Sequence, residues 1–155
     1  MLSQKTKYAL QALSKLAVNY GKGPTLIPLI AEEKGIPLRF LENILHELKQ
    51  EGLLISHRGR NGGYELAKHP SRIKLATIIR LVDGPIAMLS CVSLHFYEPC
   101  DGCNEKHCGL KGVMAEARDA ILVCSKRKPS PILWMIDAAH EQAFFPPWFS
   151  LSFFF

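Results

Sequence analysis

Glycine and proline divide the first half of this 155-residue chain into short segments, and no other feature constrains its fold as much. Apolar residues recur at helical spacing over residues 3–20, 28–34 and 38–51, which predicts three helices. The breaks between them contain Gly21-Lys22-Gly23-Pro24 and Gly35-Ile36-Pro37. Glycine adopts the left-handed conformation that ends a helix, and proline does not continue one. The pattern therefore predicts several short packed helices rather than one long helix.

Two strand-like runs follow the third helix, at residues 53–58 and 64–67, with the glycine-rich residues 59–63 between them. This pattern is typical of a β-hairpin. Two further helices are predicted over residues 73–83 and 110–124. Three short helices followed by a hairpin is the order of a winged helix-turn-helix. We expect a mainly α fold with a small β-hairpin wing and a long C-terminal helix.

The apolar repeats also predict which side of each helix is buried, because residues three or four apart share one face. The predicted buried residues are Ala9, Leu10, Leu13, Leu16, Ala17 and Tyr20 in the first helix, Phe40, Leu41, Ile44, Leu45 and Leu48 in the third, Ile73, Ile78, Ile79 and Val82 in the fourth, and Leu110, Val113, Met114, Ala117 and Ile121 in the last.

Charge is unevenly distributed along the chain, whose net charge is +5. Residues 1–84 carry 13 Lys/Arg against 7 Asp/Glu, whereas residues 85–155 carry 6 against 7. A basic first half indicates that this half meets a polyanion, of which nucleic acid is the usual example. A basic surface without a specific partner is the alternative on charge alone.

The exposed face of the third helix carries candidate base-reading residues. In a winged helix-turn-helix, a tight turn lets this helix enter the major groove, where its first exposed residues face the base edges. Those residues here are Arg39, Glu42 and Asn43. Arginine binds guanine through two hydrogen bonds, and glutamate accepts one from cytosine. An ordinary solvated helix face is the alternative for any one of them.

The hairpin tip and the start of the first helix add candidate contacts to double-stranded DNA. Arg58, Arg60 and Asn61 lie in the hairpin turn, where they are expected to reach a minor groove or phosphates. Lys5 and Tyr8, near the start of the first helix, are weaker candidates for phosphate contacts because basic N-termini are common.

Four of the five cysteines fall within 18 residues: Cys91, Cys100, Cys103 and Cys108. A polar, glycine-containing loop has little core in which to bury four thiols, so metal binding is favoured over structural burial. Four thiolates suit either an iron–sulfur cluster or tetrahedral zinc, and the spacing does not separate the two. His95, His107 and nearby carboxylates are alternative ligands. Cys124 continues the apolar stripe of the last helix and is interpreted as a small buried residue.

Several functional classes are disfavoured. The sequence lacks a glycine-rich phosphate loop and the G-x-S-x-G and H-E-x-x-H motifs, so an enzyme is not expected. The longest uncharged stretches are shorter than the roughly 20 residues needed to span a bilayer. The N-terminus does not resemble a signal peptide, and we therefore expect a cytoplasmic protein without a membrane role.

Taken together, the motifs resemble the Rrf2 family of bacterial winged helix-turn-helix transcription regulators. The resemblance covers roughly residues 1–124. The motifs that carry it are Tyr8-Ala9-Leu10, Phe40-Leu41-Glu42-Asn43-Ile44-Leu45, Gly52-Leu53-Leu54, the wing Ser56-His57-Arg58-Gly59-Arg60-Asn61-Gly62-Gly63-Tyr64-Glu65-Leu66, and residues 78–85 followed by Cys91.

The resemblance implies a homodimeric repressor or activator. In the family's sensing members, three cysteines and a fourth ligand that varies between members hold an iron–sulfur cluster, whereas some members lack a cluster. Cys91 matches the first cysteine position, Cys108 the last, and either Cys100 or Cys103 the middle one. Glu42 matches a position that helps tune sequence choice. Two features depart from the family: this loop offers four cysteines, and an aromatic tail replaces the usual C-terminal element.

These observations predict three regions: a DNA-binding domain over residues 1–84, a cluster-binding loop over 85–109, and a dimerisation helix with an aromatic tail over 110–155. The expected function is a sequence-specific transcriptional regulator that senses iron–sulfur, redox or nitric-oxide status through a cysteine-ligated cluster. One alternative is a winged-helix regulator with structural zinc or no metal in the loop. Another is a protein-interaction module with no DNA role.

Overall fold

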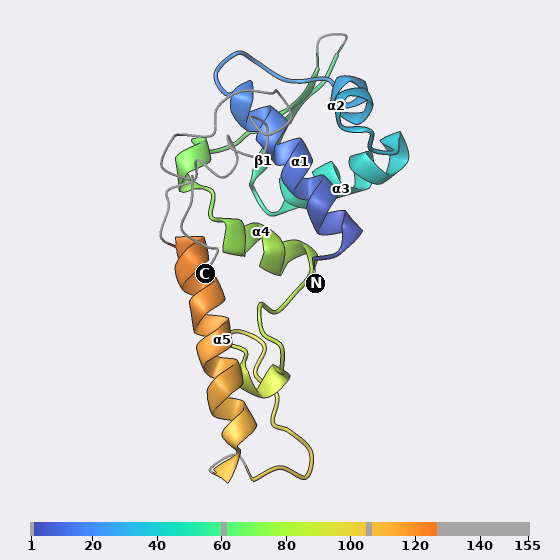
Figure 1. Cartoon of the computed structure of the whole chain (residues 1–155). Coiled ribbons are helices and arrows are strands. Elements are labelled where there is room, and N and C mark those ends of the chain that lie inside the picture. Colours follow the sequence, from blue (N-terminus) through green and yellow to red (C-terminus); the bar gives the residue numbers. More distant parts are fainter. Residues whose placement is uncertain (1, 60–61, 105–106, 127–155) are drawn as a thin grey trace, which may run out of the picture.

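The computed structural model describes residues 2–59, 62–104 and 107–126. For residues 124–126 it describes the backbone alone. Its first part, residues 2–84, forms a globular head, and residues 85–126 form an arm that extends from it (Figure 1). In the arm, the loop runs away from the head and α5 (Gly109–Lys126) returns toward it. The arm therefore holds the loop cysteines Cys91, Cys100, Cys103 and Cys108 away from the head.

The three predicted N-terminal helices are present as α1 (Gln4–Val18), α2 (Ile27–Lys34) and α3 (Leu38–Gln50). Ser3 caps α1, since its hydroxyl accepts a hydrogen bond from the Thr6 N–H at 3.1 Å. Gly35 ends α2 in the left-handed conformation, with φ of 62°. Gly35 thus ends α2 as the sequence predicts, whereas α1 ends at Val18, two residues before the predicted end.

The core of the head lies between α1 and α3, and the stripe predicted for α3 is right in four of five positions. Leu41, Ile44, Leu45 and Leu48 are all at most 1% exposed. Phe40 was predicted to be buried, and this is wrong, because it is 40% exposed. One residue corresponds to about 100° around a helix. Phe40 therefore lies beside the buried face, at the edge that borders the start of α1.

Tyr20 is a second correction, since it is 41% exposed rather than part of the buried stripe of α1. The helix ends at Val18, so the helical period no longer applies at residue 20. The Tyr20 ring instead packs edge-on against His69, with ring centroids 5.2 Å apart.

The predicted hairpin consists of β1 (Leu54–His57) and β2 (Gly63–Leu66), paired antiparallel with Leu54 opposite Leu66. A bridge from the α1–α2 connection extends it: the Thr25 N–H donates to the Tyr64 carbonyl at 2.9 Å, and the Tyr64 N–H donates to the Thr25 carbonyl at 3.0 Å. Gly63 has φ of 144°, and a Cβ there would lie 2.2 Å from the Thr25 carbonyl oxygen. Only glycine fits this close approach, which fixes the wing to the head.

The rest of the head comprises η1 (Pro70–Arg72) and α4 (Leu75–Val82). Ile73 and Ile78 are buried as predicted, whereas Ile79 and Val82 are only half-buried. The head ends at Gly84, which has φ of 89° and leads into the arm.

The arm contains η2 (Ser90–Val92) and α5, which packs against η2 and α4. The apolar stripe predicted for α5 is largely open in this single chain, because Leu110, Val113 and Ile121 are 56%, 60% and 41% exposed. Leu122, outside that stripe, is buried, at 6% exposure. No helix in the described part of the chain is long and apolar enough to cross a membrane.

Candidate DNA interface and cysteine loop

The turn between α2 and α3 presents the start of α3 at the surface. Gly35 reverses the chain, and buried Ile36 donates its N–H to the Ala31 carbonyl at 2.9 Å. Pro37 then caps α3 with φ of −56°, which proline adopts without strain. Because Ile36 anchors the turn in the core, the first turn of α3 has a fixed orientation relative to α2. This is the arrangement a helix-turn-helix requires.

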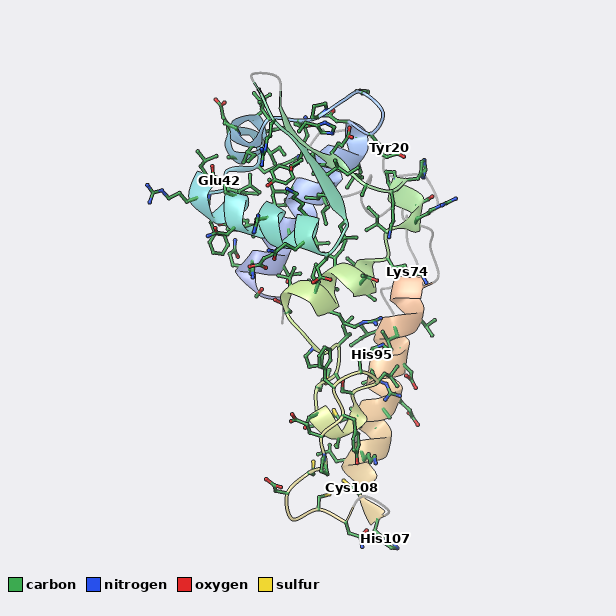
Figure 2. The ribbon with its side chains drawn as sticks, turned by 180° about the vertical axis from the view of Figure 1, so that it is seen from behind. Tyr20, Glu42, Lys74, His95, His107 and Cys108 are labelled. Atoms are coloured by element: carbon green, nitrogen blue, oxygen red, sulfur yellow. The ribbon has the colours of Figure 1, made fainter. Side chains whose placement is uncertain are left out.

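The predicted base-reading residues Arg39, Glu42 and Asn43 are all exposed on the face of α3 opposite its buried stripe. Figure 2 shows Glu42 at the outer edge of the head, on the side away from the arm. His46, one turn further along α3, is exposed on the same face and hydrogen-bonds Gln50 at 3.1 Å. The face is polar and open, as a major-groove surface must be.

The wing adds an exposed arginine to the surface of the head. Arg58 is exposed directly after β1, whereas Arg60 and Asn61 lie outside the described residues. The turn depends on a second close approach, since a Cβ at Gly62 would lie 2.3 Å from the His57 carbonyl oxygen. His57 pairs across the hairpin with Glu65, with 2.8 Å between Nε2 and Oε1.

The start of α1 lies against α3, and both predicted contact residues there have partners in α3. The Lys5 ammonium forms an ion pair with Glu47, at 2.6 Å from Oε2. The Tyr8 ring packs edge-on against Phe40, with ring centroids 5.8 Å apart. Sequence reasoning missed both partners, because 42 residues separate Lys5 from Glu47 and no local pattern connects them. The two pairs bring the start of α1 to the edge of the α3 face.

The cysteine loop lies at the far end of the arm, where Figure 2 labels Cys108 and His107, with Glu42 in the head. Cys91 in η2 is buried, Cys100 and Cys108 are half-buried, and Cys103 is exposed. The loop is fixed to its surroundings at two points. The Arg118 guanidinium of α5 donates to the Val92 carbonyl, and the Arg80 guanidinium of α4 donates to His95 Nε2 at 2.8 Å.

The four thiols interact in two pairs. A hydrogen bond with Cys91, followed by burial, raises the pKa of Cys100 to about 11. The backbone N–H of Lys111, followed by a hydrogen bond with Cys103, lowers the pKa of Cys108. Cys108 thus lies where the first N–H groups of α5 favour a thiolate. The negative charges of Cys103 and Cys108 add smaller upward contributions to the pKa of Cys100.

The donor set fits a soft metal or cluster better than a hard cation, because all four groups are sulfur. The thiols are arranged as pairs, and within the described residues no group of three or more His, Cys, Asp or Glu side chains is gathered closely enough for a metal site. His95 uses Nε2 to accept from Arg80, which can only donate. His107 is exposed beside Cys108, and the side chain of Cys124 lies outside the described residues.

The fold and the exposed α3 face define a winged helix-turn-helix DNA-binding protein. Residues 2–124 match the Rrf2 family, described as an iron-dependent transcriptional regulator. The chain therefore belongs to the Rrf2 family of transcriptional regulators and not to a family of enzymes, as the sequence predicts.

The chain is also similar in sequence to individual transcriptional regulators. An rrf2-like HTH-type transcriptional regulator of Rhodobacter capsulatus is 43% identical over 127 residues, which cover 79% of this chain and 85% of the relative. The regulator IscR of Escherichia coli is 37% identical over 90 residues, or 58% of this chain and 56% of the relative.

Solved structures agree on the fold. The structure of CymR, the global cysteine regulator of Bacillus subtilis, is 28% identical with a TM-score of 0.68 and covers 83% of this chain and 91% of that one. The structure of T. potens IscR is 27% identical with a TM-score of 0.67 and covers 96% of each chain. These similarities confirm the predicted winged helix-turn-helix.

Proposed function

We propose that this chain is a cytoplasmic regulator that binds a specific DNA operator through α3 and the wing. The observation that carries this proposal is the open polar face of α3, whose orientation is set by the Gly35 turn and buried Ile36. Arg39, Glu42 and Asn43 read base edges in the major groove. Family membership argues against the alternative in which the chain has no DNA role.

Backbone contacts come from the wing and from the start of α1. Arg58, Arg60 and Asn61 reach phosphates or the minor groove beside the α3 site. Lys5 and Tyr8 contact phosphates at the edge of the α3 face. An ammonium group has three donors, so Lys5 binds a phosphate while it retains Glu47.

The experiment that tests this function is a salt titration of binding to DNA from the chain's own promoter. Arg58→Ala should lower the slope of log affinity against log salt by about one unit, because one fewer phosphate is neutralised. Arg39→Ala should instead relax sequence preference, at about 1–3 kcal/mol for removal of a bidentate base contact. The exposed Glu51→Gln on the same head is the matched control. If both arginine variants bind every DNA as the wild type does while remaining folded, the proposed surface is wrong.

A second copy of the chain is the proposed partner of α5. Leu110, Val113 and Ile121 form an open apolar stripe along this helix, wide enough to pack against the same helix of another copy. A two-fold dimer places two α3 helices on two half-sites of a palindromic operator. Sedimentation at micromolar concentration should therefore report a dimer, and a monomer with and without DNA would contradict this.

The cysteine loop is the proposed sensor. Cys91, Cys100, Cys103 and Cys108 would hold an iron–sulfur cluster, which supplies sensitivity to iron supply, oxidants or nitric oxide. Support comes from the all-sulfur donor set and from the Lys111 N–H that favours a Cys108 thiolate. The loop is joined to α4 through His95 and Arg80 and to α5 through Val92 and Arg118. Movement of the loop is thereby transmitted to both elements that connect arm and head.

Zinc is the second candidate for the loop, since four thiolates in a turn also suit a tetrahedral structural site. Iron and sulfide analysis of anaerobically purified protein, with its visible absorption, separates the two. Visible absorption with iron supports the sensor. Colourless protein with one zinc per chain would assign the loop a structural role.

A further inference from the structure

Asp83 joins the two ends of the head. Ser3 donates its backbone N–H to Asp83 Oδ2 at 2.9 Å, and its hydroxyl donates to Oδ1 of the same carboxylate. The two residues are 80 positions apart in the chain. Ser3 caps the start of α1 and Asp83 caps the end of α4, so one side chain connects the first helix of the head to its last.

The contact extends into the first turn of α1. The Ser3 hydroxyl also accepts from the Thr6 N–H at 3.1 Å, and the Lys7 N–H donates to the Ser3 carbonyl at 3.1 Å. Thr6 is fully buried. Although burial acts to raise it, hydrogen bonds from Ser3 and Thr6 hold the pKa of Asp83 below its usual value, so the group is a carboxylate at neutral pH. A carboxylate beside a helix N-terminus is also favoured by the helix dipole.

This contact lies between the proposed DNA surface and the arm. Figure 1 shows the N-terminus next to the end of α4, at the point where the chain leaves the head. Gly84, with φ of 89°, follows directly and starts the arm. On the other side, the first turn of α1 carries Lys5, which pairs with Glu47 of α3, and exposed Lys7.

We propose that Asp83 is a positioning residue for DNA binding: it holds the first turn of α1 so that the lysines of that turn meet the phosphate backbone. This inference rests on the proposed DNA-binding function. Asp83 itself does not touch DNA, and as an anion it opposes DNA on charge alone. Simple electrostatics predicts that removing a carboxylate strengthens binding to a polyanion. The proposal predicts the opposite, namely that removing the Asp83 carboxylate lowers the affinity for DNA.

The test compares Asp83→Asn with Glu51→Gln in the full-length protein. Each removes one negative charge from the head, but exposed Glu51 lies at the end of α3 and is outside the Ser3 contact. We expect Asp83→Asn to weaken binding to promoter DNA by about three- to tenfold and to lower the salt slope by about one unit, since one lysine no longer meets a phosphate. Glu51→Gln should bind equally or slightly more tightly, with the salt slope of the wild type.

A Lys7→Ala background separates positioning from loss of stability. If Asp83 acts through the lysines of α1, Asp83→Asn should have less effect in this background than in the wild type. An equal loss in both backgrounds with an unchanged salt slope, or an Asp83→Asn variant that binds as tightly as Glu51→Gln, would overturn the proposal.

Hydrogen exchange supplies a readout that does not depend on DNA. Asp83→Asn should accelerate exchange of the Ser3, Thr6 and Lys7 amides while leaving α3 protected. If the wild type bound no DNA, the proposed function would fail by itself. Unchanged exchange at these three amides would then separately refute the role assigned to Asp83.

Discussion

The head and the arm of this protein are stabilised in different ways. The head buries a continuous apolar core in which Leu13, Leu41, Leu45 and Ile78 are completely enclosed. In the arm, the apolar side chains Met88, Leu94, Phe96, Tyr97, Leu110 and Val113 are between 52% and 64% exposed. We therefore expect the head to fold on its own core and the arm to be stabilised by what covers its open apolar surface. This difference supports the proposal that the head recognises DNA and that the arm responds to partners and ligands.

The largest difference is expected from truncating one leucine in each region. Leu45→Ala removes a fully buried side chain from the head and should lower the free energy of unfolding by about 2–5 kcal/mol. Leu110→Ala in the arm removes a side chain that is 56% exposed and should change the unfolding of the head by less than about 0.5 kcal/mol. Urea unfolding followed by circular dichroism measures both. Equal losses would show that the two regions share one core.

A charge on the open stripe of α5 tests the partner of the arm. Val113→Lys places an ammonium where a second copy is expected to pack, and each copy contributes one. The dimer should dissociate at least about a hundredfold more readily, which corresponds to about 2.7 kcal/mol. Gly112→Lys adds the same charge about 100° further around the helix. Sedimentation should show weakening for the first variant only, and equal behaviour would assign the interface to another face.

Two glycine-to-alanine substitutions should have opposite effects on stability, one in the head and one in the arm. Gly63→Ala forces a Cβ to within 2.2 Å of the Thr25 carbonyl oxygen and should destabilise the head by about 1–3 kcal/mol. Gly112→Ala in α5 meets no atom within 4 Å and should stabilise the helix by about 0.5–1 kcal/mol. Thermal unfolding of both variants gives the comparison. A neutral Gly63→Ala would mean that the wing is not fixed to Thr25.

Acid should loosen the head slightly at the Ser3–Asp83 contact. The pKa of Asp83 is lowered in the folded protein, because the hydrogen bonds from Ser3 and Thr6 outweigh burial, which acts to raise it. Its stabilising contribution is thus complete above the unfolded pKa of about 3.9 and is lost as pH falls through the lower, folded value. For this exposed residue we expect less than about 1 kcal/mol. Asp83→Asn should remove this part of the acid dependence, and an unchanged pH profile would contradict it.

Local sequence patterns predict the elements of this fold well, since glycine, proline and apolar spacing act within a few residues. They place the Gly35 turn, the open face of α3 and the wing. They fail where position depends on distant parts of the chain: Phe40 is exposed because Leu41 and its helical neighbours occupy the core, and Tyr20 lies beyond the end of α1. The Ser3–Asp83 contact has no local signature, since its partners are 80 residues apart.

The cysteine loop shows the same limit. Its four thiols are evident from their density in the sequence, but their arrangement is not, because an irregular loop has no period from which to infer neighbours. The structure pairs Cys91 with Cys100 and Cys103 with Cys108. The sequence alone leaves open whether Cys100 or Cys103 is the middle ligand.

The most direct test of the division between head and arm is one titration of promoter DNA by anaerobically purified full-length protein, before and after removal of iron by a chelator. We expect the wild type to lose visible absorption and to change its DNA affinity by at least about fivefold, or about 1 kcal/mol. Cys91→Ser should bind DNA like the chelated wild type in both conditions, because its head is intact. Protein that contains no iron and gives the same binding curve before and after chelation would contradict the account.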